Sequence, residues 1–149
     1  MALATCLLVS IARSRRLSII VAGEEHATRQ HLHTVVERTL GARVREALDG
    51  WEVMSLLLMP GNLVDLVISE LGVLRGSGLD ALVPIRAAGI EVPFLLVGGP
   101  VRPALHATAA RLGALLLDEP VEVSDLLAGV RQLCGSVRSR RPRGGLTVC

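Results

Sequence analysis

Three glutamates follow apolar stretches of the chain, where their carboxylates could bind a cation. Glu70 follows the apolar run 64–69, Glu24 lies just after the run 19–22, and Glu119 lies just after the run 114–117. If these runs are parallel strands, their carboxyl ends face one crevice. Carboxylate oxygens there could bind Mg²⁺ or Ca²⁺. The alternative is that all three are solvated loop acids, and we adopt it: we expect no metal, no other cofactor and no catalytic residue.

The cysteines and histidines do not suggest a second reactive site. Cys6, Cys134 and Cys149 are widely spaced and odd in number, which favours reduced thiols in a cytoplasmic protein. His31 and His33 are two residues apart on an expected helix, so they point to different faces and form no metal pair. We expect His31 to be partly buried and His33 to be exposed. No local motif suggests a Ser-His-Asp or Cys-His arrangement.

The elements that must position the glutamates alternate between strand and helix. Short apolar runs predict strands over 19–22, 64–69, 92–97 and 114–117, and an alternating pattern predicts one over 43–48. Helical spacing, with glycine or proline at the ends, predicts helices over 26–40, 51–59, 79–88, 103–112 and 124–134. Strands this apolar must be covered on both faces, so the pattern predicts a doubly wound α/β fold with a parallel sheet.

Two terminal segments flank one expected domain over residues 17–134. Residues 1–16 form an apolar and then basic extension; its charges follow the apolar run, unlike those of a secretory signal, and the run is too short to span a bilayer. Residues 135–149 are expected to form a disordered basic tail. The net charge is only +2, so we expect no membrane or nucleic-acid partner beyond weak contact through this tail.

The strand leading to Glu70 and the loop 71–78 after it resemble the phosphoacceptor segment of bacterial response-regulator receiver domains, the CheY-like family. The resemblance extends over residues 17–134. It implies a flavodoxin-like sheet of five parallel strands in the order 2-1-3-4-5, flanked by five helices. It also implies that Glu70 stands where these domains carry a phosphorylated aspartate.

The resemblance implies that the reactive positions are degenerate. Gly23 and Glu24 match the acidic pair that holds a metal, Gly98 matches a Thr or Ser that senses the phosphoryl group, and Leu116 matches an aromatic switch. Glu119, before Pro120, matches an invariant lysine, and the chain contains no lysine. A misplaced carboxylate and a reversed charge both oppose phosphoryl transfer, so we do not expect conventional phosphorylation.

The second expected helix is apolar almost all the way round, although a surface helix needs only one apolar stripe. Trp51, Met54 and Leu58 are therefore candidates for contact with a partner protein or a second copy. Two alternatives are that the apolar segment 2–12 of the same chain covers this helix and that these side chains are buried locally.

The sequence thus predicts a stand-alone pseudo-receiver that acts as a phosphorylation-independent interaction or scaffolding module in bacterial signalling, not an enzyme. The alternative is an atypical two-component regulator still switched by metal or ligand at the degenerate acidic site. The identity of the partner and the oligomeric state do not follow from the sequence.

Overall fold

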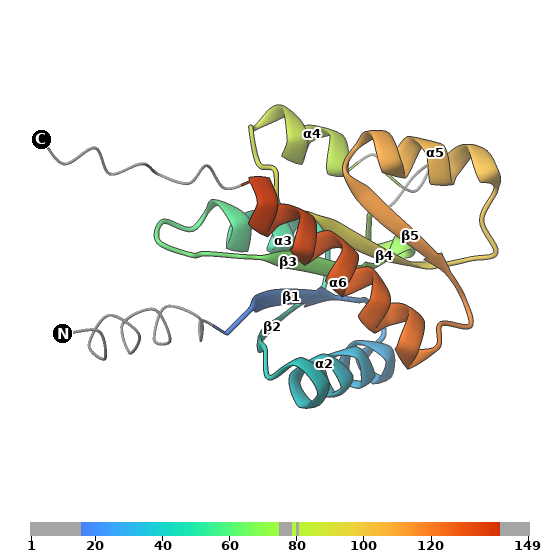
Figure 1. Ribbon diagram of the computed structural model, residues 1–149. Helices are drawn as coiled ribbons and strands as arrows, with labels where there is room; N and C mark the ends of the chain where they lie inside the picture. The colour runs from blue at the N-terminus through green and yellow to red at the C-terminus, as the bar shows by residue number, and fades with distance from the viewer. Residues whose placement is uncertain (1–15, 75–78, 80, 141–149) are drawn as a thin grey trace, which may run out of the picture.

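The computed structural model describes residues 16–74, 79 and 81–140 of the chain (Figure 1). Five parallel strands form one sheet in the order β2-β1-β3-β4-β5, which confirms the predicted fold class. The strands are β1 Ser18–Ala22, β2 Arg43–Ala47, β3 Leu66–Glu70, β4 Phe94–Gly98 and β5 Ala114–Asp118. The helices are α2 His26–Leu40, α3 Gly50–Leu58, α4 Leu82–Ala87, α5 Pro103–Arg111 and α6 Val123–Arg140, with a 3₁₀ helix, η1, at Leu71–Leu74.

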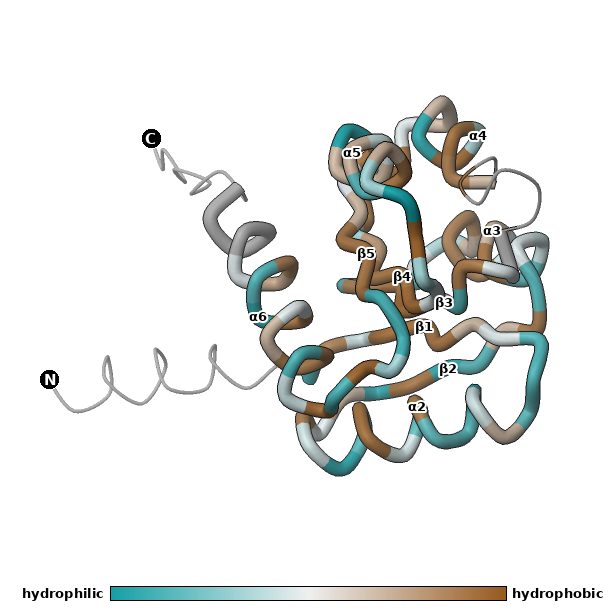
Figure 2. Tube along the Cα trace, turned by 90° about the vertical axis from the view of Figure 1, so that its right-hand side faces the viewer, coloured by the Kyte–Doolittle hydropathy of each residue, from teal (hydrophilic) through white to brown (hydrophobic). Residues whose placement is uncertain are grey.

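Two separate hydrophobic cores hold the helices on the sheet, one on each face (Figure 2). Alternate residues of a strand point to opposite faces. In β1, Ile19 and Val21 pack toward α2 and α6, whereas Ile20 and Ala22 pack toward α3, α4 and α5. The central strands are therefore apolar throughout, as expected for a parallel sheet that is covered on both sides.

Short-range signals set several helix ends. Gly41 adopts a φ of 60° after α2, and its N–H donates to the carbonyl of Glu37 at 2.9 Å. The carboxylate of Asp49 accepts a hydrogen bond of 2.9 Å from the N–H of Glu52 and so caps α3. Pro103 begins α5, where its missing N–H costs little.

The final helix differs from its prediction. The sequence predicts an end at Cys134 and disorder from Gly135, but α6 continues to Arg140, so residues 135–140 are helical. Gly135 does not stop the helix because an exposed glycine inside a helix costs only about 1 kcal/mol. Residues 1–15 and 141–149 of the predicted extension and tail lie outside the described residues, and the division into these segments stays a prediction.

The loop after Glu70 also differs from its prediction. Leu71–Leu74 form η1 at once after β3, and α4 begins at Leu82 rather than near Leu79. The prediction placed Leu79 in the helix, and in the structure that residue is buried ahead of the helix.

None of the helices in the described part of the chain is long and apolar enough to cross a membrane.

Candidate functional site

The carboxyl ends of four strands bring the predicted site residues to one edge of the sheet. Glu70 ends β3 beside Val97 of β4, and Gly98 ends β4 beside Asp118 of β5. Gly23 follows β1, and its N–H donates to the carbonyl of Ala47 at 3.1 Å. The predicted glutamates share this edge.

The Glu70 carboxylate lies over Gly23. A Cβ atom built on Gly23 would be 3.1 Å from Glu70 Cδ and 3.2 Å from Glu70 Oε1. Real Cβ contacts are rarely this close, so the longer acid uses the space that a side chain at position 23 would need. The Glu70 carboxylate also accepts a backbone hydrogen bond from Glu24.

The environment of Glu70 favours its protonated form. Burial raises the pKa of the Glu70 carboxyl above its usual value, and the negative charges of Glu25, Glu119 and Glu24 raise this pKa further. The backbone hydrogen bond from Glu24 opposes these effects but is outweighed by them. Glu24 and Glu119 thus lie near enough to Glu70 to affect the pKa of its carboxyl.

Leu71 fills the space beside Gly98. A Cβ atom on Gly98 would lie 2.7 Å from Leu71 Cβ, a distance that requires one of the two residues to move. Gly98 therefore has neither a hydroxyl nor room for one. Leu116, at the position of the expected aromatic switch, is a buried aliphatic residue of β5.

Glu119 is exposed, and its N–H donates to the carbonyl of Gly98 at 3.2 Å. Its neighbour Asp118 forms an ion pair with His106 of α5, with Nε2 and Oδ1 3.3 Å apart. No group of three or more His, Cys, Asp or Glu side chains within residues 16–74, 79 and 81–140 is arranged to hold a metal ion.

Arg29 of α2 is a site residue that the sequence analysis missed. Its side chain is buried, and Nη1 donates to the carbonyl of Gly23 at 2.7 Å. Nη2 lies 3.1 Å from His26 Nδ1, and Nε lies 3.5 Å from Glu46 Oε2. The available signal was the spacing of Arg29 with Leu32 and Val36, which places it on the buried stripe of the helix.

The environments of the two histidines of α2 are the opposite of those predicted. His31 is exposed, and His33 is half-buried because it packs toward β2. His33 Nδ1 lies 2.9 Å from Glu46 Oε1, and Nε2 lies 3.7 Å from Glu37 Oε2. The hydrogen bond with His33 is the main cause of the lowered pKa of Glu46.

The outer side of α3 and its flanks is apolar and exposed. Trp51 is 83% exposed and Leu58 is 59% exposed, so local burial does not account for them within the described structure, whereas Met54 packs partly against the core. We call the exposed apolar residues around this helix the α3 face: Leu48, Trp51, Leu58, Met59 and Leu63.

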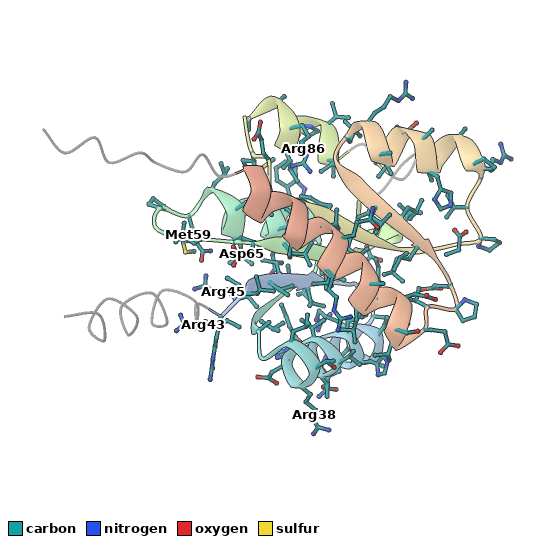
Figure 3. All side chains as sticks on the ribbon, viewed as in Figure 1. Arg38, Arg43, Arg45, Met59, Asp65 and Arg86 are labelled. Carbon is teal, nitrogen blue, oxygen red and sulfur yellow. The ribbon has the colours of Figure 1, made fainter. Side chains whose placement is uncertain are left out.

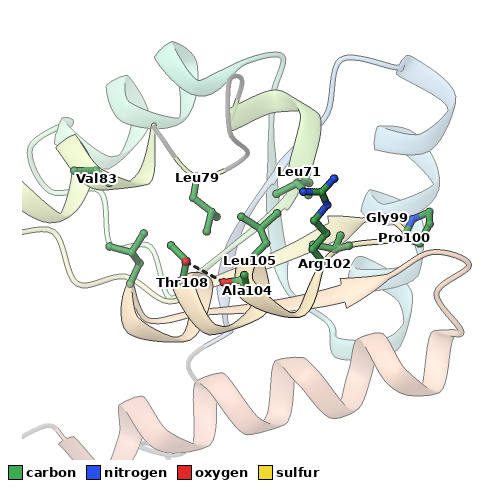
Figure 4. Close-up of a pocket in the computed structure, with 11 residues that line it drawn as sticks. Leu71, Leu79, Val83, Gly99, Pro100, Arg102, Ala104, Leu105 and Thr108 are labelled. Atoms are coloured by element: carbon green, nitrogen blue, oxygen red, sulfur yellow. Dashed lines mark hydrogen bonds between the residues drawn. The ribbon is translucent and has the colours of Figure 1, made fainter.

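An apolar groove of about 670 Å³ lies between α4 and α5 and opens toward Leu71 and Gly99 (Figure 4). Arg86 holds the two walls together. Its guanidinium donates to the carbonyls of Leu112 and Ile90, each at 2.7 Å, and lies 5.4 Å from the centroid of the Phe94 ring. Burial lowers the pKa of Arg86, although an arginine stays charged at neutral pH.

Comparison with protein families finds no match for this sequence, and comparison with curated proteins finds none either. Solved structures do match. The signal receiver domain of an HD domain-containing protein from Pseudomonas fluorescens Pf-5 is 26% identical, with a TM-score of 0.72 over 87% of this chain and 95% of that one. A response regulator receiver domain protein from Clostridium thermocellum is 22% identical, with a TM-score of 0.73 over 83% of this chain and 98% of that one.

A third similar structure is the Francisella response regulator 1452 receiver domain, which is 20% identical with a TM-score of 0.71 over 82% of this chain and 99% of that one. The strand order found here, 2-1-3-4-5, is that of CheY. The chain therefore has the fold of the CheY-like response-regulator receiver domains.

Proposed function

We propose that this chain is a cytoplasmic pseudo-receiver that acts as a phosphorylation-independent interaction or scaffolding module in bacterial signalling, without enzymatic activity. The observation that carries the proposal is steric. The space over Gly23 is taken by the Glu70 carboxylate, and the space beside Gly98 is taken by Leu71.

Electrostatics supports the same proposal. Phosphoryl transfer to a carboxylate depends on positioning and on neutralising charge as it develops. By the receiver resemblance, Glu119 stands where receiver domains carry a lysine. Its negative charge contributes to the raised pKa of Glu70.

The proposed mode of action is contact through a fixed surface. The α3 face offers exposed tryptophan, leucine and methionine side chains, residue types that protein interfaces use. The partner would be another protein or a second copy of the chain, and its recognition would not depend on a phosphoryl group.

Backbone NMR spectra titrated with Mg²⁺ and then with beryllofluoride, a phosphoryl mimic, test this function. We expect no saturable shift at Glu24, Glu70, Gly98 or Glu119, because Glu70 and Leu71 occupy the space beside Gly23 and Gly98 and because Glu119 adds a negative charge. Glu70→Gln is the matched control, since shifts that persist in this variant do not come from the acidic site. Saturable shifts at these residues that Glu70→Gln abolishes would overturn the proposal.

The second candidate is an atypical regulator switched by metal or ligand at the degenerate acidic site. The observation in its favour is the electrostatic strain on Glu70, whose pKa is raised by burial and by Glu25, Glu119 and Glu24. A bound cation would relieve that repulsion. The Mg²⁺ titration decides between the two functions, because only this candidate predicts saturation at Glu24 and Glu70.

A further inference from the structure

The α3 face is an exposed apolar surface, and folded domains usually bury such surfaces against another segment or molecule. Its members are between 49% and 83% exposed. No charged residue occurs from Val53 through Val64, and the exposed Ser55 is the polar side chain on the outer side of α3 in this stretch. Several large apolar side chains exposed along one helix and its flanks indicate a contact with another segment or molecule.

The chain enters the sheet beside this face. The N–H of Ser18 donates to Asp65 Oδ2 at 2.9 Å, and the carbonyl of Ser18 accepts from the N–H of Asp65 at 2.8 Å. Leu63 lies just before Asp65, and the side chain of Asn62 donates to the carbonyl of Leu56 in α3 at 2.8 Å. Figure 3 labels Met59 and Asp65 at this end of the molecule.

Residues 2–12, which precede this entry point, have the complementary chemistry. They carry no charged side chain and include five large aliphatic ones: Leu3, Leu7, Leu8, Val9 and Ile11. We propose that residues 2–12 pack against the α3 face of the same chain. The inference rests on the proposed docking role of that face and adds its regulation, because a partner must then displace a segment that already covers it.

The lengths are compatible with this contact. The linker 13–16 spans up to about 13 Å at about 3.3 Å per residue. Helix α3, which has nine residues, is about 14 Å long at about 1.5 Å per residue. The eleven residues 2–12 cover about 16 Å even at that compact helical rise, which is at least the length of α3.

Tethering favours this segment over a second copy of the chain. A segment held by a short flexible linker meets its target at an effective concentration of about millimolar. A second copy meets the same face only at the concentration of the protein in solution. At micromolar protein, the covalently attached segment therefore has the advantage.

Trp51 allows a direct test, because it is the only tryptophan and the chain has no tyrosine. Acrylamide quenching and the emission maximum of Trp51 would be compared in the full chain and in a variant that lacks residues 2–12. Leu7→Asp/Leu8→Asp in the full-length chain is the matched variant, since it keeps the length while removing apolar contact. Far-UV circular dichroism checks that each protein is folded.

We expect a blue-shifted and several-fold less quenchable Trp51 in the full chain, with both properties independent of concentration and lost in both variants. Equal quenching in all three folded proteins would overturn the inference. Shielding that disappears on dilution would also overturn it, because it would show that a second copy covers the face. A shielded Trp51 combined with saturable beryllofluoride shifts would refute the proposed function alone.

Discussion

At the scale of single residues, the site is defined by the side chains that fill the space beside its two glycines. Two glycines, Gly23 and Gly98, stand at the strand ends, and the side chains of Glu70 and Leu71 fill the volume beside them. These two filling residues are adjacent in the chain. A single segment, the end of β3 and the start of η1, therefore closes both positions.

We predict that Gly98→Ala lowers the free energy of unfolding by about 1–3 kcal/mol, the usual cost of overpacking, because its Cβ would lie 2.7 Å from Leu71 Cβ. Urea denaturation measures the change. Gly72→Ala is the control, since nothing lies within 4 Å of a Cβ at that position. In the Leu71→Ala background Gly98→Ala should cost less, and an equal cost in both backgrounds would contradict this account.

The raised pKa of Glu70 predicts a pH-dependent stability. As pH rises, the unfolded chain loses the Glu70 proton at its ordinary pKa, before the folded chain does. The free energy of unfolding therefore falls as pH rises through this window, from about pH 4 upward, and the loss remains above the folded-state pKa. Glu70→Gln cannot titrate and should lack this fall, while its amide oxygen can still accept the hydrogen bond from Glu24.

Urea denaturation over a series of pH values measures this difference. Glu91→Gln, at an exposed glutamate of the loop before β4, is the control for the loss of one carboxyl. If the difference between the natural chain and Glu70→Gln stays constant from acid to neutral pH, the repulsion inferred around Glu70 is absent.

The sequence alone identifies the site positions but not how they are filled. Glu70 and Glu119 could be located because they follow apolar runs, and Gly98 was located through the receiver resemblance. The contacts of Glu70 with Gly23 and of Leu71 with Gly98 depend on tertiary packing, which no local pattern encodes. Arg29 was missed because an arginine on an apolar stripe is ordinarily assumed to extend into solvent, whereas here it bonds the Gly23 carbonyl.

At the scale of helices and strands, hydrophobic periodicity was sufficient for the fold. The apolar runs and the glycine and proline stops predicted every strand of the sheet, and the receiver resemblance supplied their order. The ends were less predictable. Gly135 suggested a stop for α6, yet the residues after it contain no proline before Pro142, and the helix continues to Arg140.

We predict that Gly135→Ala raises the free energy of unfolding by about 0.5–1 kcal/mol, the gain expected inside an exposed helix. Nothing lies within 4 Å of a Cβ at this position, so the alanine meets no obstacle. Urea denaturation measures the gain. An unchanged free energy would indicate that the helix ends near Cys134, as the sequence pattern suggested.

At the scale of the whole molecule, the edge strand β2 and the α3 face present different surfaces. The edge strand β2 exposes Arg43, Arg45 and Glu46, whereas the nearby α3 face is apolar. Charged side chains on an edge strand discourage pairing with the edge of another sheet. The edge of β2 is therefore poorly suited to pairing with another sheet, whereas the α3 face carries no such charges.

We predict that Arg43→Val/Arg45→Val produces concentration-dependent oligomers, because the edge strand loses the charges that prevent pairing. Sedimentation velocity over a dilution series measures the association. Arg111→Val removes an exposed arginine from α5 and is the control for lost charge. If the double variant stays monomeric, these arginines do not prevent pairing at the edge of β2.

The contact between Gly98 and Leu71 has an evolutionary consequence. A lineage could acquire a hydroxyl side chain at position 98 only if Leu71 became smaller first or at the same time, because the intermediate with both side chains is overpacked. The constraint at position 23 is weaker, because a Cβ there would meet the end of the flexible Glu70 side chain at 3.1 Å, which can move by a few tenths of an ångström. Substitutions at positions 98 and 71 are therefore coupled: a larger side chain at one position requires a smaller side chain at the other.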